Sequence, residues 1–259
     1  AQGGPASGWE PTVVFGEAGR LSQLLNEKGV ATHQIAPLAR DIALISDISS
    51  FFRMLVYLWR LRPDVIHLNS SKAAALGALA ARLSGIGNIV FTVHGWPFKE
   101  RRNALARTLI YWISWLTAIM SRTVIVVSKL DEADGQKMWG VGKKIRYVPI
   151  GIETPNFLER EEALRFLGET IFALKNARGT PKIVTIAELT PNKGISYAIE
   201  AIAKLKDRGV NVLYVLIGDG EERAHLKSVA RKHGIEDRVL FSGFIRDAAQ
   251  YLKAADVFL

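Results

Sequence analysis

The sequence has no cysteine, so disulfide bonds and cysteine-ligated metal sites are excluded. This absence is compatible with a reducing compartment, and we expect the protein to work in the cytoplasm. Long hydrophobic runs are absent too. The longest candidate, residues 108–121, is uncharged but falls short of the roughly 20 residues that a membrane-spanning helix needs. The sequence therefore predicts no membrane span.

What is present is an ordinary globular composition with an excess of positive charge. Apolar residues make up 49% and charged residues 23%, as in soluble domains. A length of 259 residues is enough for two α/β domains with their own cores. The formal net charge of +9 favours an anionic partner, such as a sugar nucleotide, a lipid phosphate or a nucleic acid.

Short apolar runs alternate with helical patterns along the sequence. Strands are expected at residues 12–15, 30–35, 65–68, 89–93, 123–127, 145–148, 183–186, 212–217, 239–241 and 256–259. Helices are expected at 21–28, 48–61, 73–83, 104–121, part of 130–139, 161–167, from 195 onward, 221–233 and 248–254. This alternation predicts the α/β class, with parallel sheets covered by helices on both faces. Two prolines and a glycine at 149–155 indicate a linker between two doubly wound domains, 1–152 and 153–259.

The segment KIVTIAELTPNKG, residues 182–194, joins a strand, a polar turn and the first turn of a helix. A helix N-terminus leaves backbone N–H groups without intrahelical partners, and these groups attract phosphate. Lys193 adds a positive charge at the same place. The pattern favours a phosphate site, although a plain strand-to-helix turn with a solvated lysine explains it equally well.

Two polar clusters follow other predicted strands, where open parallel sheets bind their ligands. Ser70, Ser71 and Lys72 precede a helix, so they suit an anion or a sugar hydroxyl, unless Ser71 simply caps the helix. His94 and Trp96 follow the next strand. The histidine is placed to orient an acceptor and the indole to stack on a sugar, and a buried structural histidine is the alternative.

A third cluster, Gly218-Asp219-Gly220, follows the strand expected at 212–217. Glycine at such a position lets a ligand approach the backbone closely. The spacing is not the G-x-G-x-x-G fingerprint of dinucleotide binding, so this cluster alone is weak evidence for a nucleotide site.

Taken together and in this order, the motifs resemble the retaining group 1 (family 4) branch of the GT-B glycosyltransferases. The resemblance runs from about residue 12 to residue 259. Its motifs are SSKA at 70–73, FTVHGWPF at 91–98, VVS at 126–128, PIGIE at 149–153, AELTPNKG at 187–194, IGDGEER at 217–223 and FSGFIRD at 241–247. The resemblance implies two Rossmann-like domains, with the nucleotide sugar held mostly by the second and the acceptor by the first.

The same resemblance implies roles for individual residues. Lys193 would contact the donor diphosphate, and His94 would lie at the reacting sugar as the catalytic residue. The remaining donor-binding residues would be Glu188, Gly218, Asp219, Gly220, Phe244 and Ile245, with the backbone near the last two facing the base. The acceptor-binding residues would be Ser70, Ser71, Lys72 and Trp96.

The sequence also departs from the family pattern. Glu188 stands where many members carry an arginine, so half of the usual diphosphate clamp is changed, and Ile150 replaces an asparagine of the hinge motif. The family's first strand with its Gly-Gly loop, and its downstream pair of donor-binding glutamates, have no counterpart here. We therefore expect both domains to be incomplete, and this chain alone to be inactive.

The expected reaction is transfer of a sugar from a UDP- or GDP-sugar to an acceptor of a cell-surface polysaccharide or a lipid-linked glycan, with retention. Positive charge at helix N-termini and at Lys193 would stabilise the departing diphosphate. No Asp-x-Asp motif or paired histidine spacing occurs, so neither a metal nor another cofactor is expected. The alternatives are a non-catalytic nucleotide- or sugar-binding fragment and a GT-B sugar-nucleotide 2-epimerase. The expected partners include no nucleic acid.

The helix expected at 104–121 suggests contact with the inner face of an anionic membrane. Lys99, Arg101, Arg102 and Arg107 cluster at its start, and tryptophans follow along it. Its apolar residues run most of the way around, so the alternative is a helix buried in the first domain with only the basic turn exposed.

Overall fold

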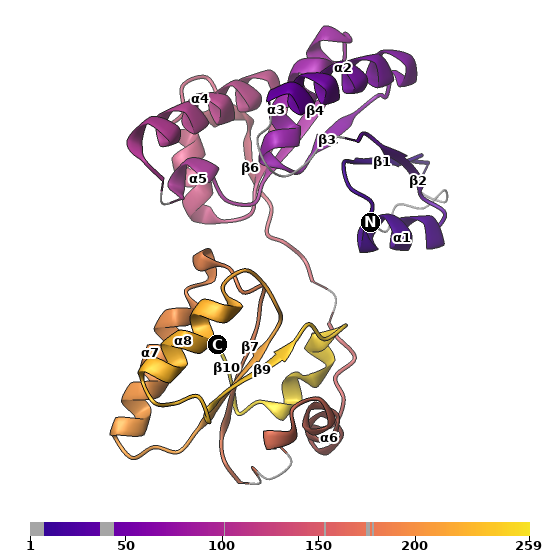
Figure 1. The fold of residues 1–259 in the computed structure, drawn as a ribbon. Helices are drawn as coiled ribbons and strands as arrows, with labels where there is room; N and C mark the ends of the chain where they lie inside the picture. The colour runs from indigo at the N-terminus through magenta and orange to yellow at the C-terminus, as the bar shows by residue number, and fades with distance from the viewer. Residues whose placement is uncertain (1–7, 37–43, 101, 153, 175–176, 178) are drawn as a thin grey trace. The chain divides into compact units, whose positions relative to one another are not determined.

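The chain divides into two units, unit 1 at Ala1–Gly151 and unit 2 at Ile152–Leu259, next to the expected linker. The computed structural model describes residues 8–36, 44–100, 102–152, 154–174, 177 and 179–259, without the side chains of residues 44 and 71. Each unit contains its own parallel sheet (Figure 1). The α/β class expected from the alternating pattern is therefore confirmed.

Unit 2 is built on a four-stranded parallel sheet in the order β10-β7-β8-β9. Its strands are β7 (Lys182–Ile186), β8 (Leu213–Ile217), β9 (Val239–Gly243) and β10 (Val257–Phe258). The chain runs outward from β7 to β8 and β9, and then returns to place β10 on the other side of β7. This reversal makes the carboxyl end of β7 the topological switch point of the sheet, where such folds bind ligands.

Helices cover both faces of this sheet. Helices α7 (Ile195–Asp207) and α8 (Arg223–Lys232) lie side by side over one face, whereas α6 (Arg160–Thr170) and the 3-10 helix η6 (Ala248–Ala254) cover the other (Figure 1). Both faces are covered because both are apolar. In strand β8, Tyr214 and Leu216 belong to the core under α7 and α8, and Val215 and Ile217 belong to the core under α6 and η6. A strand buried on both faces reads as a continuous apolar run. The doubly wound arrangement is confirmed for unit 2.

Unit 1 contains a four-stranded parallel sheet in sequential order, β3-β4-β5-β6. The strands are β3 (Ile66–Leu68), β4 (Ile89–Val93), β5 (Thr123–Val126) and β6 (Ile145–Tyr147). Its core takes residues from α2 (Leu44–Leu61), the alanine-rich α3 (Ser71–Leu83) and α4 (Ala104–Met120). Helix α5 (Lys129–Gln136) and the 3-10 helices η2 (Pro97–Lys99) and η3 (Gly142–Lys144) complete this part.

The first two strands of unit 1 form a separate sheet. Strand β1 (Thr12–Phe15) pairs in parallel with β2 (Ala31–Gln34), and α1 (Arg20–Glu27) connects them. Ile35, directly after β2, is buried in the core of unit 1, and the His33 ring stacks on Tyr57 of α2 at 3.9 Å between ring centroids. The two-stranded sheet is thus attached by side-chain packing.

None of the helices that the structure describes combines the length and the apolar character that crossing a membrane requires.

Candidate functional site

Three loops of unit 2 meet beyond the carboxyl ends of β7, β8 and β9. The Leu189 amide donates to the Asp219 carbonyl at 3.0 Å, and the Glu222 amide donates back to the Leu189 carbonyl at 2.9 Å. The Gly218 amide donates to the Gly243 carbonyl at 2.9 Å. Backbone hydrogen bonds therefore fix these loops to one another at the switch point of the sheet.

Gly218 and Gly220 leave room for the backbone of the neighbouring loop, which a side chain at either position would clash with. A Cβ atom at Gly218 would lie 1.9 Å from the Ala187 carbonyl oxygen, and one at Gly220 would lie 2.5 Å from that of Leu189. Gly218 also has a φ of 144°, which side chains rarely allow. The sequence argument assigned the close approach at this cluster to a ligand. The structure corrects that reason, because the neighbouring β7 loop occupies the space.

Lys193 lies at the end of the 3-10 helix η5 (Pro191–Lys193), directly before α7. The turn is possible because Gly194 adopts a left-handed conformation with φ 64°. The Lys193 side chain is exposed, and no ion pair joins it to any residue of the described ranges, Glu188 included. A cation without a carboxylate partner thus stands beside a helix N-terminus.

The other predicted donor residues have varied surroundings. The Asp219 carboxylate accepts from the Gly220 amide at 2.9 Å and from Arg223 Nη1 at 2.8 Å, so its charge is largely balanced. Phe244 is 71% exposed, whereas Ile245 packs partly against the core below α6 and η6. An exposed aromatic ring next to these loops can stack on a flat ligand.

In unit 1, His94 follows β4 and is exposed, at a turn where Gly95 has a φ of 122°. A second histidine, His67 of β3, lies near it and was not singled out from the sequence. Its Nε2 is 2.7 Å from the Thr92 hydroxyl. Partial burial lowers the pKa of His67, and the charge of His94 lowers it further. The sequence feature that could have pointed to His67 is a single polar residue inside an apolar strand.

The predicted acceptor residues at the start of α3 have structural partners. The Ser70 hydroxyl accepts from the Ala73 amide at 3.4 Å, so Ser70, not Ser71, caps the helix. The side chain of Ser71 lies outside the described part of the chain. Lys72 Nζ lies 2.5 Å from a carboxylate oxygen of Asp47 on α2. Lys72 therefore ties α3 to α2.

Trp96 corrects the expectation of an exposed stacking residue. The residue is 2% exposed, and its indole N–H donates to the Asp131 carbonyl at 2.9 Å. Its ring stacks on Phe98 at 5.5 Å between centroids. The indole is buried because the chain after β4 turns inward against α5, and no face of the ring is left for a sugar.

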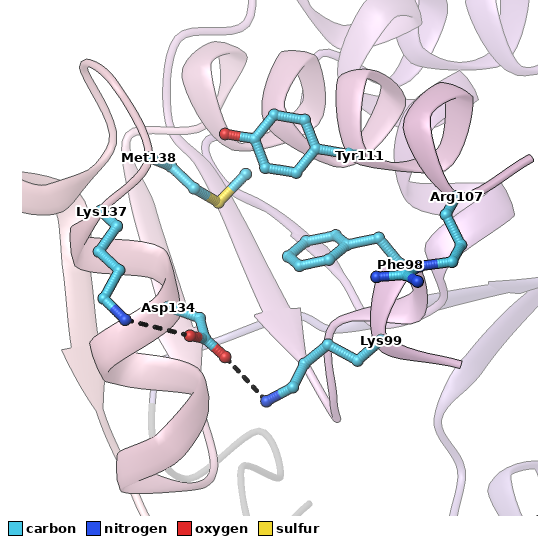
Figure 2. Close-up of a pocket in the computed structure, with 7 residues that line it drawn as sticks. All are labelled: Phe98, Lys99, Arg107, Tyr111, Asp134, Lys137 and Met138. Atoms are coloured by element: carbon cyan, nitrogen blue, oxygen red, sulfur yellow. Dashed lines mark hydrogen bonds and ion pairs between the residues drawn. The ribbon is translucent and has the colours of Figure 1, made fainter. Parts of the chain in front are cut away.

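A cavity of about 320 Å³ lies next to this tryptophan, between η2, α4 and α5. Figure 2 shows its lining residues, which are Phe98, Lys99, Arg107, Tyr111, Asp134, Lys137 and Met138. From the sequence, Lys99 and Arg107 were expected only as charges at the start of a helix. Sequence spacing could not show that α5 brings Asp134 and Lys137 to the same place.

A metal site finds no support within the described residues, where no three histidine, aspartate or glutamate side chains gather. Metal independence of the reaction stays a prediction.

Residues 1–155 match the model of Glycosyltransferase Family 4, and residues 168–259 match that of Glycosyl transferases group 1. The chain belongs to glycosyltransferase family 4. The family expected from the motif order is thereby confirmed.

Relatives within this family are transferases by name. An Escherichia coli UDP-Gal:alpha-D-GlcNAc-diphosphoundecaprenol alpha-1,3-galactosyltransferase is 27% identical over 98% of this chain and 66% of its own length. A 2-deoxystreptamine glucosyltransferase of Streptomyces kanamyceticus is 31% identical over 70% of this chain and 48% of its own. The chain thus spans between about half and two thirds of these relatives. Their names do not favour the epimerase alternative.

Solved structures show the same fold. Anabaena HepE, in complex with UDP and glucose, has a TM-score of 0.75 at 18% identity, covering 95% of this chain and 65% of HepE. The sucrose-phosphate synthase of Thermosynechococcus elongatus also reaches 0.75 at 18% identity, covering 98% and 66%. The chain therefore has the GT-B fold in the part that these proteins share.

Proposed function

We propose that the protein acts in a glycosyltransferase that moves a sugar from a UDP- or GDP-sugar to a lipid-linked or polysaccharide acceptor, with retention and without a metal. Membership of glycosyltransferase family 4 supports the reaction class. The Escherichia coli relative, whose name contains a diphosphoundecaprenol acceptor, supports the acceptor class. A non-catalytic sugar-binding role gains no comparable support.

The observation that carries this proposal is the unpaired Lys193 at the switch point of unit 2. Sugar transfer builds negative charge on the departing diphosphate, and a fixed cation beside a helix N-terminus stabilises that charge. Arg223 balances Asp219, so that carboxylate does not repel the diphosphate strongly. Phe244 would stack on the base of the nucleotide.

In unit 1, His94 is the residue proposed to lie at the reacting sugar. Its exposed position after β4 lets it donate a hydrogen bond to a sugar hydroxyl or to the acceptor. His67 and Thr92 form a hydrogen-bonded pair near it, which would help to hold the region in one arrangement.

The test compares binding of UDP, GDP and uridine to the chain by calorimetry. Lys193→Ala should weaken binding of the diphosphate nucleotide about tenfold and leave uridine binding unchanged, because a charge-assisted contact to phosphate is lost. The matched control is Lys204→Ala, an exposed lysine further along α7. Equal effects of the two variants on UDP and GDP binding would contradict the phosphate role of Lys193.

The protein is also proposed to contact the surface of an anionic membrane through α4. This helix buries its small residues Ser114, Thr117 and Ala118 against the rest of unit 1. Several of its large residues are exposed, among them Leu105 at 82% and Trp112 at 56%, whereas Tyr111, Trp115 and Ile119 pack partly against the core. These exposed side chains favour membrane contact over a buried helix with only its basic turn exposed.

The net positive charge at the start of α4 is smaller than the sequence suggested. Arg102 forms an ion pair with Glu100 at 2.8 Å, and Lys99 pairs with Asp134 at 2.8 Å. Arg101 lies outside the described residues. Apolar insertion of α4 would then provide much of the membrane affinity, and the remaining cations would add about 1 kcal/mol each near an anionic surface.

A further inference from the structure

The cavity between η2, α4 and α5 is a cationic site in unit 1 to which the proposed reaction assigns no role. We propose that it binds the phosphate group of a lipid-linked acceptor. The proposal rests on the transferase function above and names the residues that would hold the acceptor's anionic group: Lys99, Arg107 and Lys137.

The cavity has an excess of positive charge. Asp134 accepts from Lys99 at 2.8 Å and lies 3.7 Å from Lys137 Nζ. The hydrogen bond between Lys99 and Asp134 raises the pKa of the lysine and lowers that of the aspartate, so both stay ionised. Arg107 forms no ion pair with any residue in the described ranges. Asp131 Oδ1 also lies 3.7 Å from Lys99 Nζ. Two carboxylates facing three cations leave one positive charge in excess, which a phosphate would balance.

The walls of the cavity are well suited to hold an anion in one place. Figure 2 shows Asp134 between Lys137 and Lys99, with the Arg107 guanidinium beside the ring of Phe98. One turn earlier on α5, the Asp131 carboxylate accepts from the Ser128 hydroxyl at 2.6 Å, and the Asp131 backbone carbonyl accepts from the Trp96 indole at 2.9 Å. These buried contacts join η2 to α5. A volume of about 320 Å³ is at the small end for ligand sites, which suits a phosphate or diphosphate group better than a whole glycan.

A continuous row of aromatic rings leads from the cavity to the exposed face of α4. The centroids of Phe98 and Tyr111 are 5.2 Å apart, those of Tyr111 and Trp112 5.6 Å, and those of Trp112 and Trp115 5.6 Å. Trp115 stacks in turn on Trp139, at 6.2 Å, which is 80% exposed. A cationic cavity at one end of an exposed apolar surface fits a molecule with a phosphate head and a hydrocarbon tail. A soluble anion would gain nothing from that surface.

Two of the elements that border the cavity begin at the edge of the sheet where an acceptor is expected. Helix η2 follows β4 by way of His94, and α5 follows β5 by way of Ser128. Both connections leave the carboxyl ends of parallel strands, the edge at which open sheets bind ligands. A phosphate in the cavity would therefore be held a few residues along the chain from the residue proposed to act at the reacting sugar.

The experiment measures binding of the chain to neutral phosphatidylcholine vesicles that contain a small share of a polyprenyl phosphate. Vesicles with phosphatidylglycerol at equal charge form the second arm, and inorganic pyrophosphate in solution forms the third. The double variant Arg107→Gln/Lys137→Gln is compared with Arg53→Gln/Lys129→Gln, which removes equal charge from α2 and α5 outside the cavity. Circular dichroism checks that each variant is folded.

We expect the cavity variant to lose about tenfold or more in affinity for the polyprenyl phosphate vesicles, and the control to stay within about twofold of the unchanged chain. Three results of this experiment would overturn the proposal. An equal loss in both variants, or equally tight binding to phosphatidylglycerol, would show general attraction to anionic surfaces. Binding of pyrophosphate as tight as that of the lipid would show a site for a soluble anion.

A gain of affinity provides the second measurement. Asp134→Asn removes the only carboxylate lining the described cavity and should tighten binding to polyprenyl phosphate several-fold. Glu132→Gln makes the same change of net charge on α5, outside the cavity lining, and should have no such effect. Weaker binding by Asp134→Asn would contradict the proposal. These results are independent of UDP or GDP binding by unit 2, so failure here leaves the proposed function intact.

Discussion

Among the described glycines of unit 2, Gly218 is the one where an alanine should most disrupt the loops that follow β7 and β8. The new Cβ atom would lie 1.9 Å from the Ala187 carbonyl oxygen, and the backbone would have to keep a φ of 144°. Backbone strain of this kind costs about 1–3 kcal/mol, and overpacking costs a further 1–3 kcal/mol or so. The carbonyl belongs to the backbone and cannot move aside as a flexible side chain would.

The assay is thermal unfolding followed by circular dichroism, together with hydrogen exchange of peptides from β7 and β8. Tryptophan fluorescence is unsuitable, because all six tryptophans of the sequence lie before residue 152. For a domain of this size, each kcal/mol lowers the melting temperature by roughly 4–8 °C. We therefore expect a fall of 10 °C or more, taking about 2–6 kcal/mol as the loss of unfolding free energy.

Gly209→Ala is the matched control. Gly209 also has a positive φ, 75°, but a Cβ atom there would meet nothing within 4 Å. This variant should lose only the cost of a left-handed alanine, about 1–2 kcal/mol. If both variants melt at the same temperature and exchange equally fast in β7 and β8, the close approach of the two loops is not what requires Gly218.

In the full enzyme, Lys193→Ala should reduce turnover about 100-fold, since preorganised charge at the leaving group is lost; activity within a few-fold of the unchanged enzyme would refute this. Sedimentation with anionic liposomes should show binding that falls at high salt and falls further in Trp112→Gln; no binding at low salt would refute membrane contact. Ionised Asp134 contributes to stability above its ordinary pKa of 3.8, and this contribution disappears as the pH falls through the lower pKa of the folded state. The melting temperature of Asp134→Asn should therefore depend less on pH in that range than that of the unchanged chain.

The order of elements could be predicted from the sequence because the apolar runs are short and clearly separated. Strand β8 was recognised from an apolar run that both cores of unit 2 use. The separate sheet of β1 and β2 could not be predicted, since pairing between strands depends on contacts distant in sequence. Periodicity identifies a strand but not its neighbours.

The position of Lys193 before a helix could be predicted from the strand–turn–helix segment, and the structure leaves its side chain exposed. Exposure fits both a phosphate contact and a solvated lysine, so its phosphate role stays a prediction. Trp96 was misjudged, because an indole suits both a sugar face and a core, and only the fold shows that α5 covers it. The cavity that includes Asp134 and Lys137 was missed, because its walls come from separate stretches of the chain.

Helix α4 shows why a sequence that is apolar all round leaves the buried face undetermined. Its neighbour α3 packs with buried alanines, among them Ala74, Ala78 and Ala81, and so allows a close approach. Close packing selects the small side chains of α4, and the hydroxyls of Ser114 and Thr117 are satisfied by carbonyls one turn back, at 2.8 Å each. Burying the small face leaves the leucines and Trp112 exposed to water, whereas Trp115 packs partly against the core. We therefore propose a membrane surface as the partner of this face, because cations stand at its polar end.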